Sequence, residues 1–421
     1  MSFTTARPAS WQACIACGNE LLETDAATRC RSCGGLLEVR HRPPGLDGGV
    51  LRAMFQTRCC TRPDSTASGV WRFREIVLPS AGEEIVSHPE GNTPLLYREA
   101  LAAWAGIPDL FFKHEGHNPT GSFKDRGMTV GITQARRLGV RAVACASTGN
   151  TSASLAAYAS QAGLPALVLV PAGRIAPGKL AQAVGYGARV IAVRGDFDAC
   201  LRLVEEASER LGLYLLNSVN PFRLEGQKTI VLELLQQLGW DAPDWIALPG
   251  GNLGNTSAFG KALEEARDWG LIERLPRLAV VQAEGAAPFA MSFAEGFRER
   301  RRVRAETVAT AIRIGDPVSW DRAVRAIHLT DGVVVSVSDE EILAAKAAID
   351  RAGVGCEPAS AASLAGLKRL AASGTVAADA RVVAVLTGHL LKDPEAIRAE
   401  KPLDEIEGRL EELERVVEGT A

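Results

Sequence analysis

The chain has 421 residues, of which 47% are hydrophobic and 23% charged, with 47 Lys and Arg against 50 Asp and Glu. This length predicts two or three domains with cores of their own, and the composition excludes a disordered chain. The formal charge of −3 at pH 7 argues against a nucleic-acid partner or an anionic membrane surface.

The N-terminal residues show neither the apolar core of a secretory signal nor an arginine-rich presequence. The longest apolar runs, such as 165–173, are shorter than the ~20 residues that span a bilayer. Nine cysteines, an odd number, do not fit a disulfide scaffold. We therefore expect a cytoplasmic protein with no membrane partner.

The first forty residues contain two CxxC pairs separated by twelve residues, and a glycine follows each pair. The four side chains are Cys14, Cys17, Cys30 and Cys33. Four thiolates at this spacing suit tetrahedral Zn²⁺, so the segment predicts a zinc-ribbon-like module. Because a closed four-cysteine shell leaves no open coordination position, we expect a structural metal and not a catalytic one.

Short β-branched runs alternate with amphipathic helical windows from about residue 90 to residue 394, which predicts an α/β fold with parallel sheets covered by helices. The expected strands are 142–147, 166–171, 189–195, 244–249, 277–284, 333–338 and 381–388. Several end in turns rich in Gly, Ser or Asn, where open α/β sheets bind ligands.

The tail spaces Leu403, Ile406, Leu410, Leu413 and Val417 by three or four residues, which predicts one amphipathic helix. Fewer than three heptads are present, so we expect this helix to pack on the chain's own body and not in an intermolecular coiled coil.

Lys124 follows a run of turn-forming residues, 118–122, and stands just inside a predicted helix start. Most lysines lie on solvated helix faces, and the residue alone favours that interpretation. At the ligand side of a helix entrance, however, a lysine reaches into a cleft as a Schiff-base nucleophile. The neighbouring motifs favour the second interpretation.

Two polar loops each follow a predicted strand and precede a predicted helix. The first contains five consecutive polar or glycine positions, 147–151, where a helix cap needs only one, and it suits a carboxylate or phosphate. The second, 250–255, combines glycines with a helix N-terminus and predicts a phosphate cradle. It matches neither the P-loop nor the dinucleotide pattern, which disfavours a nucleotide kinase.

Two weaker motifs are the segment with Ser218, Asn220 and Arg223, and the strand end at Thr387 and Gly388. Arg223 fits a surface cation as well as a fork for a substrate phosphate.

The segments NPTGSFKDRG, STGN, GGNLGN and LTGH together resemble the fold type II pyridoxal-phosphate enzymes, and specifically the threonine synthase family, over about residues 68–397. SGVWRFREIVLP, EGNTPLL and CEPASAASLAG are similar to that family as well. The SFKDRG, NSVNPFR and LTGHLLKDP segments are more like threonine synthases than dehydratases. The N-terminus departs from the pattern of the plant members of the family, because it offers a ribbon instead of a regulatory domain.

The resemblance implies two open, twisted, mostly parallel sheets flanked by helices, and a homodimer. The expected segments are a ribbon-like module at 1–40, a linker and first part of the large domain at 41–119, a smaller α/β domain at 120–219, the rest of the large domain at 220–400, and a C-terminal helix at 401–421.

It also implies roles for individual residues. Lys124 would hold pyridoxal 5'-phosphate covalently and move protons, Asn150 would bind its phenolic oxygen, and Thr387 would face the pyridine nitrogen. The cofactor phosphate would bind Gly250, Gly251, Asn252, Leu253, Gly254 and Asn255. The substrate carboxylate would bind Ser147, Thr148 and Thr151, and the substrate phosphate would bind Ser218, Arg223 and Asn252.

The implied reaction converts O-phospho-L-homoserine and water into L-threonine and phosphate by γ-elimination and β-addition of water. Two alternatives on the same scaffold stay open: a cysteate synthase-like β-replacement on O-phosphoserine, and a threonine or serine dehydratase. A catalytically inactive regulatory or nucleic-acid-binding protein is a third alternative, against which the intact Lys124 and the net charge argue.

Overall fold

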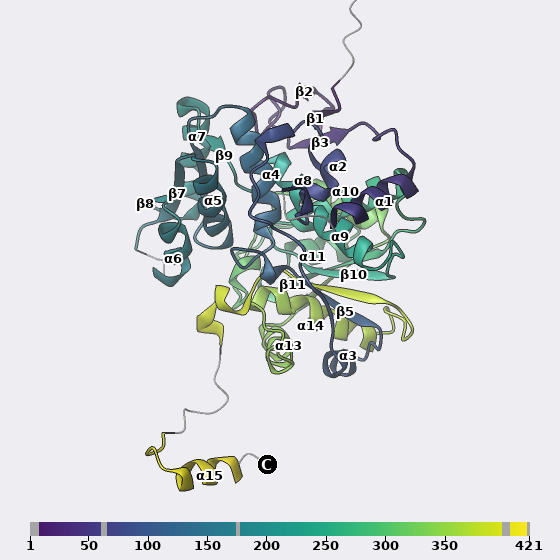
Figure 1. The fold of residues 1–421 in the computed structure, drawn as a ribbon, viewed down its shortest axis with the longest axis vertical. Coiled ribbons are helices and arrows are strands. Elements are labelled where there is room, and N and C mark those ends of the chain that lie inside the picture. The colour runs from purple at the N-terminus through teal and green to yellow at the C-terminus, as the bar shows by residue number, and fades with distance from the viewer. Residues whose placement is uncertain (1–7, 60–64, 174–176, 398–404, 419–421) are drawn as a thin grey trace, which may run out of the picture.

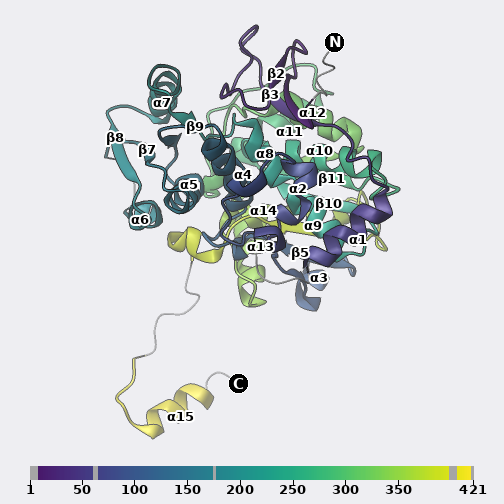
Figure 2. The ribbon, with the colours of Figure 1, turned by 45° about the horizontal axis from the view of Figure 1, so that its top comes forward.

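The computed structural model describes residues 8–59, 65–173, 177–397 and 405–418. An N-terminal module, a large sheet and a small sheet make up the fold (Figure 1). The module is a three-stranded antiparallel sheet in the order β2-β1-β3, formed by β1 (Ser10–Cys14), β2 (Glu20–Leu22) and β3 (Leu37–His41). It lies at one edge of the body, where β3 packs against α8 (Figure 2).

The large sheet has six strands in the order β12-β11-β10-β13-β5-β4, and every neighbouring pair is parallel except β4 with β5. Its strands are β4 (Leu95–Tyr97), β5 (Leu110–His114), β10 (Trp245–Pro249), β11 (Arg277–Ala283), β12 (Val333–Val337) and β13 (Val382–Leu386). The associated helices are α1 (Gly48–Cys59), α2 (Arg74–Val77), α3 (Glu99–Ala105), α8 (Pro221–Gln227), α9 (Thr229–Gln237), α10 (Gly254–Asp268), α11 (Pro288–Ala294), α12 (Trp320–Leu329), α13 (Asp339–Arg351) and α14 (Pro358–Ala372).

The small sheet has four parallel strands in the order β8-β7-β6-β9. They are β6 (Val143–Ala146), β7 (Ala166–Pro171), β8 (Arg189–Val193) and β9 (Tyr214–Leu215). The helices are α4 (Lys124–Arg137), α5 (Asn150–Gln161), α6 (Pro177–Gly185) and α7 (Phe197–Leu211). The seven runs predicted as strands therefore coincide with β6, β7, β8, β10, β11, β12 and β13, which confirms those predictions and the α/β class.

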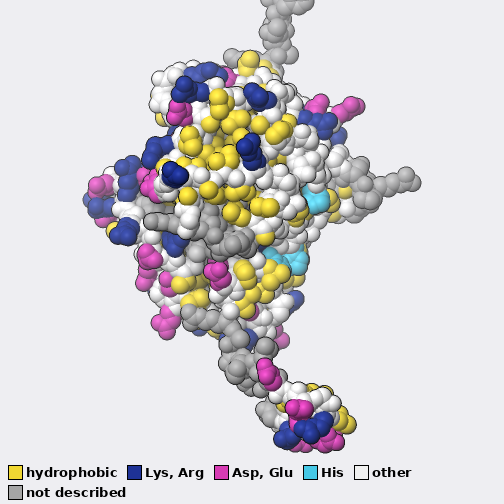
Figure 3. Space-filling view, turned by 90° about the vertical axis from the view of Figure 1, so that its left-hand side faces the viewer, with side chains coloured by type: hydrophobic (Ala, Val, Ile, Leu, Met, Phe, Trp, Pro, Cys, Tyr) yellow, Lys and Arg dark blue, Asp and Glu magenta, His cyan; other side chains and the backbone are white. Residues whose placement is uncertain are grey.

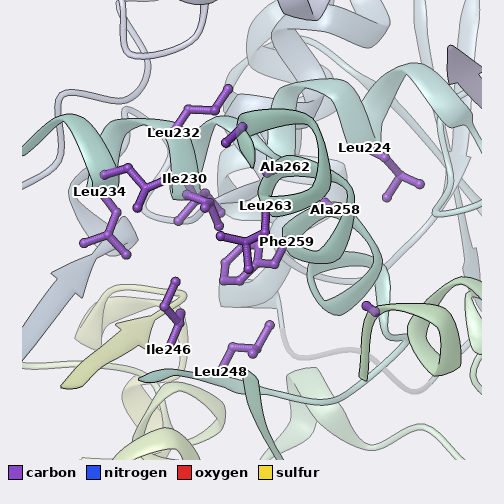
Figure 4. Close-up of a cluster of buried hydrophobic side chains, with 14 of the residues drawn as sticks. Leu224, Ile230, Leu232, Leu234, Ile246, Leu248, Ala258, Phe259, Ala262 and Leu263 are labelled. Atoms are coloured by element: carbon purple, nitrogen blue, oxygen red, sulfur yellow. The ribbon is translucent and has the colours of Figure 1, made fainter. Parts of the chain in front are cut away.

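Alternation along β10 places side chains on both faces of the large sheet. Ile246 and Leu248 pack with Phe259 of α10 in the core that Figure 4 shows. Ala247, between them, packs in a second core with residues of α13 and α14. Because both faces are covered by helices, the strand reads as a continuous apolar run.

The C-terminal helix differs from expectation in its packing. α15 (Leu410–Glu418) has no buried residue, and Figure 3 shows it apart from the body. Leu410, Leu413 and Val417 are all exposed. The predicted packing of this helix on the chain's own body is therefore wrong, because its apolar side chains stay exposed. Leu403 of the predicted stripe lies outside the described residues.

The predicted linker, which began at His41, starts inside a strand. His41 is the last residue of β3, and its side chain is fully buried. A few residues later, Gly48 at the start of α1 packs so closely on Gly270 that a Cβ would lie 2.2 Å from the Gly270 carbonyl oxygen. Both ends of this connection are thus packed against the body, while most of residues 42–47 between them are exposed. In the described parts of the chain, no helix combines the length and apolar character needed to cross a membrane.

Candidate active site

A cavity of about 680 Å³ collects residues from both sheets. It is lined by the start of α4, the loop after β6, the loop after β10, the start of α8 and the end of β13. All the residues predicted to bind cofactor or substrate line this cavity except Gly250. Gly250 lies behind the lining, where its carbonyl oxygen accepts a hydrogen bond of 2.8 Å from the Gln282 amide.

Lys124 is the first residue of α4 and is held at the cavity by the turn that precedes it. The Asp125 carboxylate accepts hydrogen bonds from the Thr120 hydroxyl (2.6 Å), the Thr120 backbone N–H (2.7 Å) and the Ser154 hydroxyl (2.6 Å). Lys124 Nζ lies 3.7 Å from the centroid of the Phe123 ring. The helix start is thus fixed from three sides, and the amine points into the cavity.

Burial, reinforced by the positive charge of Arg223, lowers the pKa of Lys124 to about 7, although the Glu357 carboxyl opposes the shift. An ordinary lysine titrates near ~10.4. At neutral pH, Lys124 is therefore a neutral amine in a large fraction of the enzyme molecules. Neutral amines are the nucleophiles that attack carbonyl carbon, so Lys124 is suited to covalent chemistry.

The loop after β10 packs closely against neighbouring segments just before the N-terminus of α10. A Cβ on Gly251 would approach the Ala311 carbonyl oxygen to 3.2 Å, and one on Gly250 would lie 2.6 Å from Val280. Leu253 adopts a left-handed conformation with φ of 60°, and α10 begins at the next residue. The Thr256 hydroxyl is buried without a hydrogen-bond partner among the described residues. Free helix N–H groups and this hydroxyl suit a phosphate group.

Thr387 and Asn150 line the same cavity as the loop residues before α10. The Thr387 hydroxyl is 3.0 Å from the Ser360 hydroxyl, and its carbonyl oxygen accepts a 3.0 Å bond from the Phe123 N–H. Asn150 begins α5 and donates to Glu357 Oε2 at 3.1 Å. The same amide nitrogen lies 3.4 Å from Glu357 Oε1, so Asn150 donates to both oxygens of that carboxylate.

Glu357 is a cavity residue that sequence reasoning missed. It is buried, burial raises its pKa, and it packs against Gly388, where a Cβ would lie 2.5 Å from the carboxyl carbon. The segment CEPASAASLAG contained one usable signal, an acid directly before the proline that begins α14. That signal alone reads as a helix N-terminus, where acidic residues are common.

Arg223, on α8, is a buried cation that faces the cavity, with 2% of its surface exposed. Its Nη1 donates to the Leu216 carbonyl oxygen at 3.0 Å, but its Nε has no partner, and no carboxylate among the described residues forms an ion pair with it. Burial lowers its pKa to about 10. Because a buried charge without a counter-ion is costly, the site favours an anionic ligand here.

The remaining predicted residues surround Arg223 and the start of α5. Asn252 Nδ2 donates to the Ser218 hydroxyl at 2.7 Å. Ser147, Thr148 and Thr151 line the cavity at the N-terminal end of α5, where free helix N–H groups attract anions. The arrangement offers three places for negative charge around one reactive amine.

The four predicted metal ligands lie away from this cavity, in the N-terminal module. Their sulfur atoms are within 4.8 Å of one another, with Cys14 to Cys33 at 3.4 Å and Cys17 to Cys30 at 3.6 Å. Cys14 and Cys30 are buried, while Cys17 and Cys33 are exposed. Four sulfur ligands in such a cluster suit a tetrahedral metal such as Zn²⁺.

The comparisons with known proteins agree with this site. Residues 86–388 match the family model described as "Pyridoxal-phosphate dependent enzyme". The chain is 46% identical over 413 residues to the threonine synthase of Methanocaldococcus jannaschii, covering 96% of this chain and 99% of the other. It is 50% identical over 315 residues to the threonine synthase of Mycobacterium tuberculosis, covering 74% of this chain and 85% of the other.

Among solved structures, threonine synthase from Escherichia coli matches with a TM-score of 0.70 at 19% identity, covering 92% of this chain and 90% of the other, which establishes a shared fold. The family match spans Lys124 and most of the cavity lining, and the match to the Methanocaldococcus jannaschii protein covers 96% of this chain. The chain is therefore a pyridoxal-phosphate dependent enzyme and belongs to the threonine synthase family.

Proposed function

We propose that this enzyme is a threonine synthase, which converts O-phospho-L-homoserine and water into L-threonine and phosphate. The observation that carries the proposal is the buried guanidinium of Arg223, which has no carboxylate partner among the described residues and faces the same cavity as Lys124. A substrate with its own phosphate supplies the missing negative charge. The names of the curated relatives support the same reaction.

The cavity residues fit pyridoxal 5'-phosphate. Lys124 would attach it, residues 250–255 with the start of α10 would bind its phosphate, Asn150 its phenolic oxygen, and Thr387 would face its ring nitrogen. When bound, the cofactor withdraws electrons from the substrate's Cα and Cβ bonds. A hydroxyl such as that of Thr387 donates to a neutral ring nitrogen, which moderates the withdrawal.

The chain's own side chains bind the substrate and move its protons. Ser147, Thr148 and Thr151 hold the carboxylate at the N-terminus of α5. Lys124 Nζ takes the proton from Cα, for which its lowered pKa of about 7 is suited. A Cβ proton is lost next, which lets the phosphate leave Cγ, and a proton is then added at Cγ to form the methyl group of threonine. Arg223, with Ser218 and Asn252, binds the phosphate and stabilises the charge that develops as it leaves Cγ.

The same three residues keep the departed phosphate in the cavity. A retained phosphate ion accepts a proton from the water that adds at Cβ, so holding the leaving group serves catalysis as well as binding. The mouth of the cavity must exclude bulk water until phosphate has left, which supports closure of the smaller domain over the substrate.

Three further features are proposed with this function. The four-cysteine cluster supports a structural Zn²⁺ in a ribbon-like module. The resemblance to threonine synthases supports a homodimer in the cytoplasm. Ser218, Arg223 and Asn252 all line the cavity, which supports a phosphorylated amino acid as the substrate class.

The test is to incubate the purified, cofactor-loaded enzyme with O-phosphohomoserine and measure threonine and phosphate. We expect equal amounts of both products, and none from Lys124→Ala. Arg223→Ala should raise KM by about 10- to 100-fold, because it removes charge-assisted hydrogen bonds of ~1.5–3 kcal/mol. The matched control Arg210→Ala removes an exposed arginine whose only described partner is Glu206 on its own helix, and should leave KM unchanged.

Turnover of O-phosphoserine with sulfite, and not of O-phosphohomoserine, would contradict the threonine synthase assignment and move the function to the β-replacement alternative. Ammonia release from unphosphorylated threonine or serine at a comparable rate would instead indicate a dehydratase.

A further inference from the structure

Through His41, the N-terminal module contacts α8, the helix that contributes Arg223 to the cavity. This residue ends β3, and its Nε2 lies 2.6 Å from Glu225 Oε2, with both side chains buried. Glu225 lies on α8, two residues after Arg223. The module is therefore attached to the helix that carries Arg223.

A second series of hydrogen bonds leads from the module to the cavity loop that contains Asn252. The Leu37 carbonyl oxygen of β3 accepts a 3.2 Å hydrogen bond from Arg322, whose other terminal nitrogen donates to the Ser319 hydroxyl at 3.3 Å. The Ser319 N–H in turn donates to the Asn252 carbonyl oxygen at 3.3 Å, and the Val318 N–H to Asn252 Oδ1 at 2.7 Å. Arg322 is 3% exposed, so the path is shielded from water.

Both paths begin on a strand that the cysteines hold in place. Leu37 pairs with Cys14 in the β1–β3 register, and its side chain packs with Cys14 and Cys30 in a small core of buried residues. These three are the only buried members of that core among the described residues, and the module's Leu36 and Val39 pack instead into cores of the body. The module therefore has little apolar core of its own. Metal binding to the four thiolates supplies the missing folding free energy in such modules.

The charged cluster around His41 offers no second metal site. His41, Glu225 and Glu265 are close enough to share an ion, but Lys228 and Lys261 already bind both carboxylates. Lys228 Nζ lies 2.5 Å from Glu225 and 2.7 Å from Glu265, and Lys261 Nζ lies 2.9 Å from Glu225 and also contacts Glu265. Two ammonium groups balance two carboxylates, so His41 acts as a hydrogen-bonding anchor.

We propose that the metal-filled four-cysteine module is a positioning element, which holds α8 and the Asn252 loop at the separation where Arg223, Ser218 and Asn252 bind phosphate together. His41 and Arg322 are the positioning residues. They touch neither Lys124 nor the loop residues that would bind the cofactor, except that the Arg322 path ends at Asn252. Loss of the module's order should therefore weaken phosphate binding more than it weakens amino-acid binding. The inference rests on the proposed function in taking a phosphate as the ligand.

The experiment measures binding of two probes to the cofactor-loaded enzyme: inorganic phosphate by calorimetry, and L-threonine, which has no phosphate, by absorbance titration. The metal is removed by replacing the exposed pair, Cys17→Ser with Cys33→Ser, and metal content is measured on each protein. Cys59→Ser, an exposed cysteine outside the module, is the matched control. Arg322→Met, His41→Ala and His41→Gln test the two paths with the metal in place.

We expect phosphate to bind about tenfold more weakly to the metal-free variant, to Arg322→Met and to His41→Ala, a change of ~1.4 kcal/mol. The dissociation constant of L-threonine and the absorbance of the bound cofactor should change little. His41→Gln, whose amide still donates to Glu225, should recover most of the affinity. In turnover of O-phosphohomoserine, KM should rise, and kcat should fall as well because the same three phosphate-binding residues stabilise the departing phosphate.

Unchanged phosphate affinity in the metal-free variant would overturn the proposal, as would equal weakening of phosphate and L-threonine, which indicates a general structural role. If the native enzyme fails to convert O-phosphohomoserine, the proposed function fails, yet the phosphate titrations still decide whether the module positions the anion site.

Discussion

At the scale of the residue, the reactivity of the site depends on the surroundings of Lys124. The amine is buried, Arg223 repels its charged form, and Glu357 partly offsets both effects, which together bring its pKa to about 7. The same Arg223 that we propose as the phosphate ligand therefore helps to keep the lysine neutral. One buried cation would then serve both binding and reactivity.

This electrostatic coupling predicts how cofactor-free enzyme captures pyridoxal phosphate. Only the neutral amine reacts, so the capture rate should rise with pH and reach half its maximum near pH 7, and not near ~10.4 as for a free lysine. Arg223→Gln should move this midpoint to higher pH because a repelling charge is lost, and Glu357→Gln should move it lower because an attracting charge is lost. Stopped-flow absorbance measures the rate.

Lys124→Ala is the control for that measurement and should show no covalent capture. A midpoint above pH 9, or shifts of the same sign in the two variants, would contradict this account of the lysine.

At the scale of the element, α4 and α8 cross at glycines, and this contact sets the position of Arg223 relative to Lys124. A Cβ on Gly226 would lie 1.7 Å from the Arg126 carbonyl oxygen, and one on Gly127 would lie 2.8 Å from the Arg223 carbonyl oxygen. The helix with the reactive amine and the helix with the anion-binding guanidinium thus touch backbone to backbone. No side chain fits between them.

Gly226→Ala should consequently force the two helices apart and lower the free energy of unfolding by about 2 kcal/mol or more, since overpacking typically costs ~1–3 kcal/mol. Urea unfolding followed by circular dichroism measures the change. Gly185→Ala is the matched control, because it lies at the end of α6 with ordinary φ and no atom within 4 Å of its Cβ position. Equal stability of the two variants would show that the helix crossing is not tight.

At the scale of the whole molecule, a buried ionic network joins the large sheet to α4 and α9. Glu233 Oε1 lies 2.6 Å from Lys113 Nζ and 2.8 Å from Arg126 Nη2, and Glu233 Oε2 lies 2.7 Å from Arg72. Arg126 also pairs with Glu115 at 2.7 Å. Burial opposes ionisation of Glu233, but the surrounding cations prevail and hold its pKa well below the usual range.

A lowered carboxyl pKa stabilises the fold at neutral pH, and the stabilisation is lost as pH falls through the folded-state pKa. Glu233→Gln leaves buried cations unpaired, so it should lower the free energy of unfolding at pH 7 by about 3–5 kcal/mol. Below the unfolded-state pKa of ~4.3, the difference in free energy of unfolding between the native enzyme and the variant should become smaller. Denaturant unfolding at pH 7, 5, 4 and 3 measures this difference, and a difference that is constant or grows in acid would contradict the network's role.

The strands, the polar loops and Lys124 followed from the sequence alone. Strands that helices cover on both faces read as short apolar runs, and helix starts and phosphate loops need Gly, Ser, Thr and Asn within a few positions. Such signals are local and can be read in a single chain. The family resemblance added roles for individual residues. All the residues with a predicted cofactor or substrate role except Gly250 line one cavity.

Only the tertiary structure showed how distant segments meet. Glu357 faces Asn150 across 207 residues of chain, and Leu37 accepts its hydrogen bond from Arg322, 285 residues away. The apolar stripe of α15 was expected to pack on the body but is exposed, and its local pattern could not show this. A contact between distant residues leaves no periodic or compositional trace, because each partner alone satisfies only its own local pattern. The sequence determined which chemical groups the enzyme has, and the fold decided which of them act together.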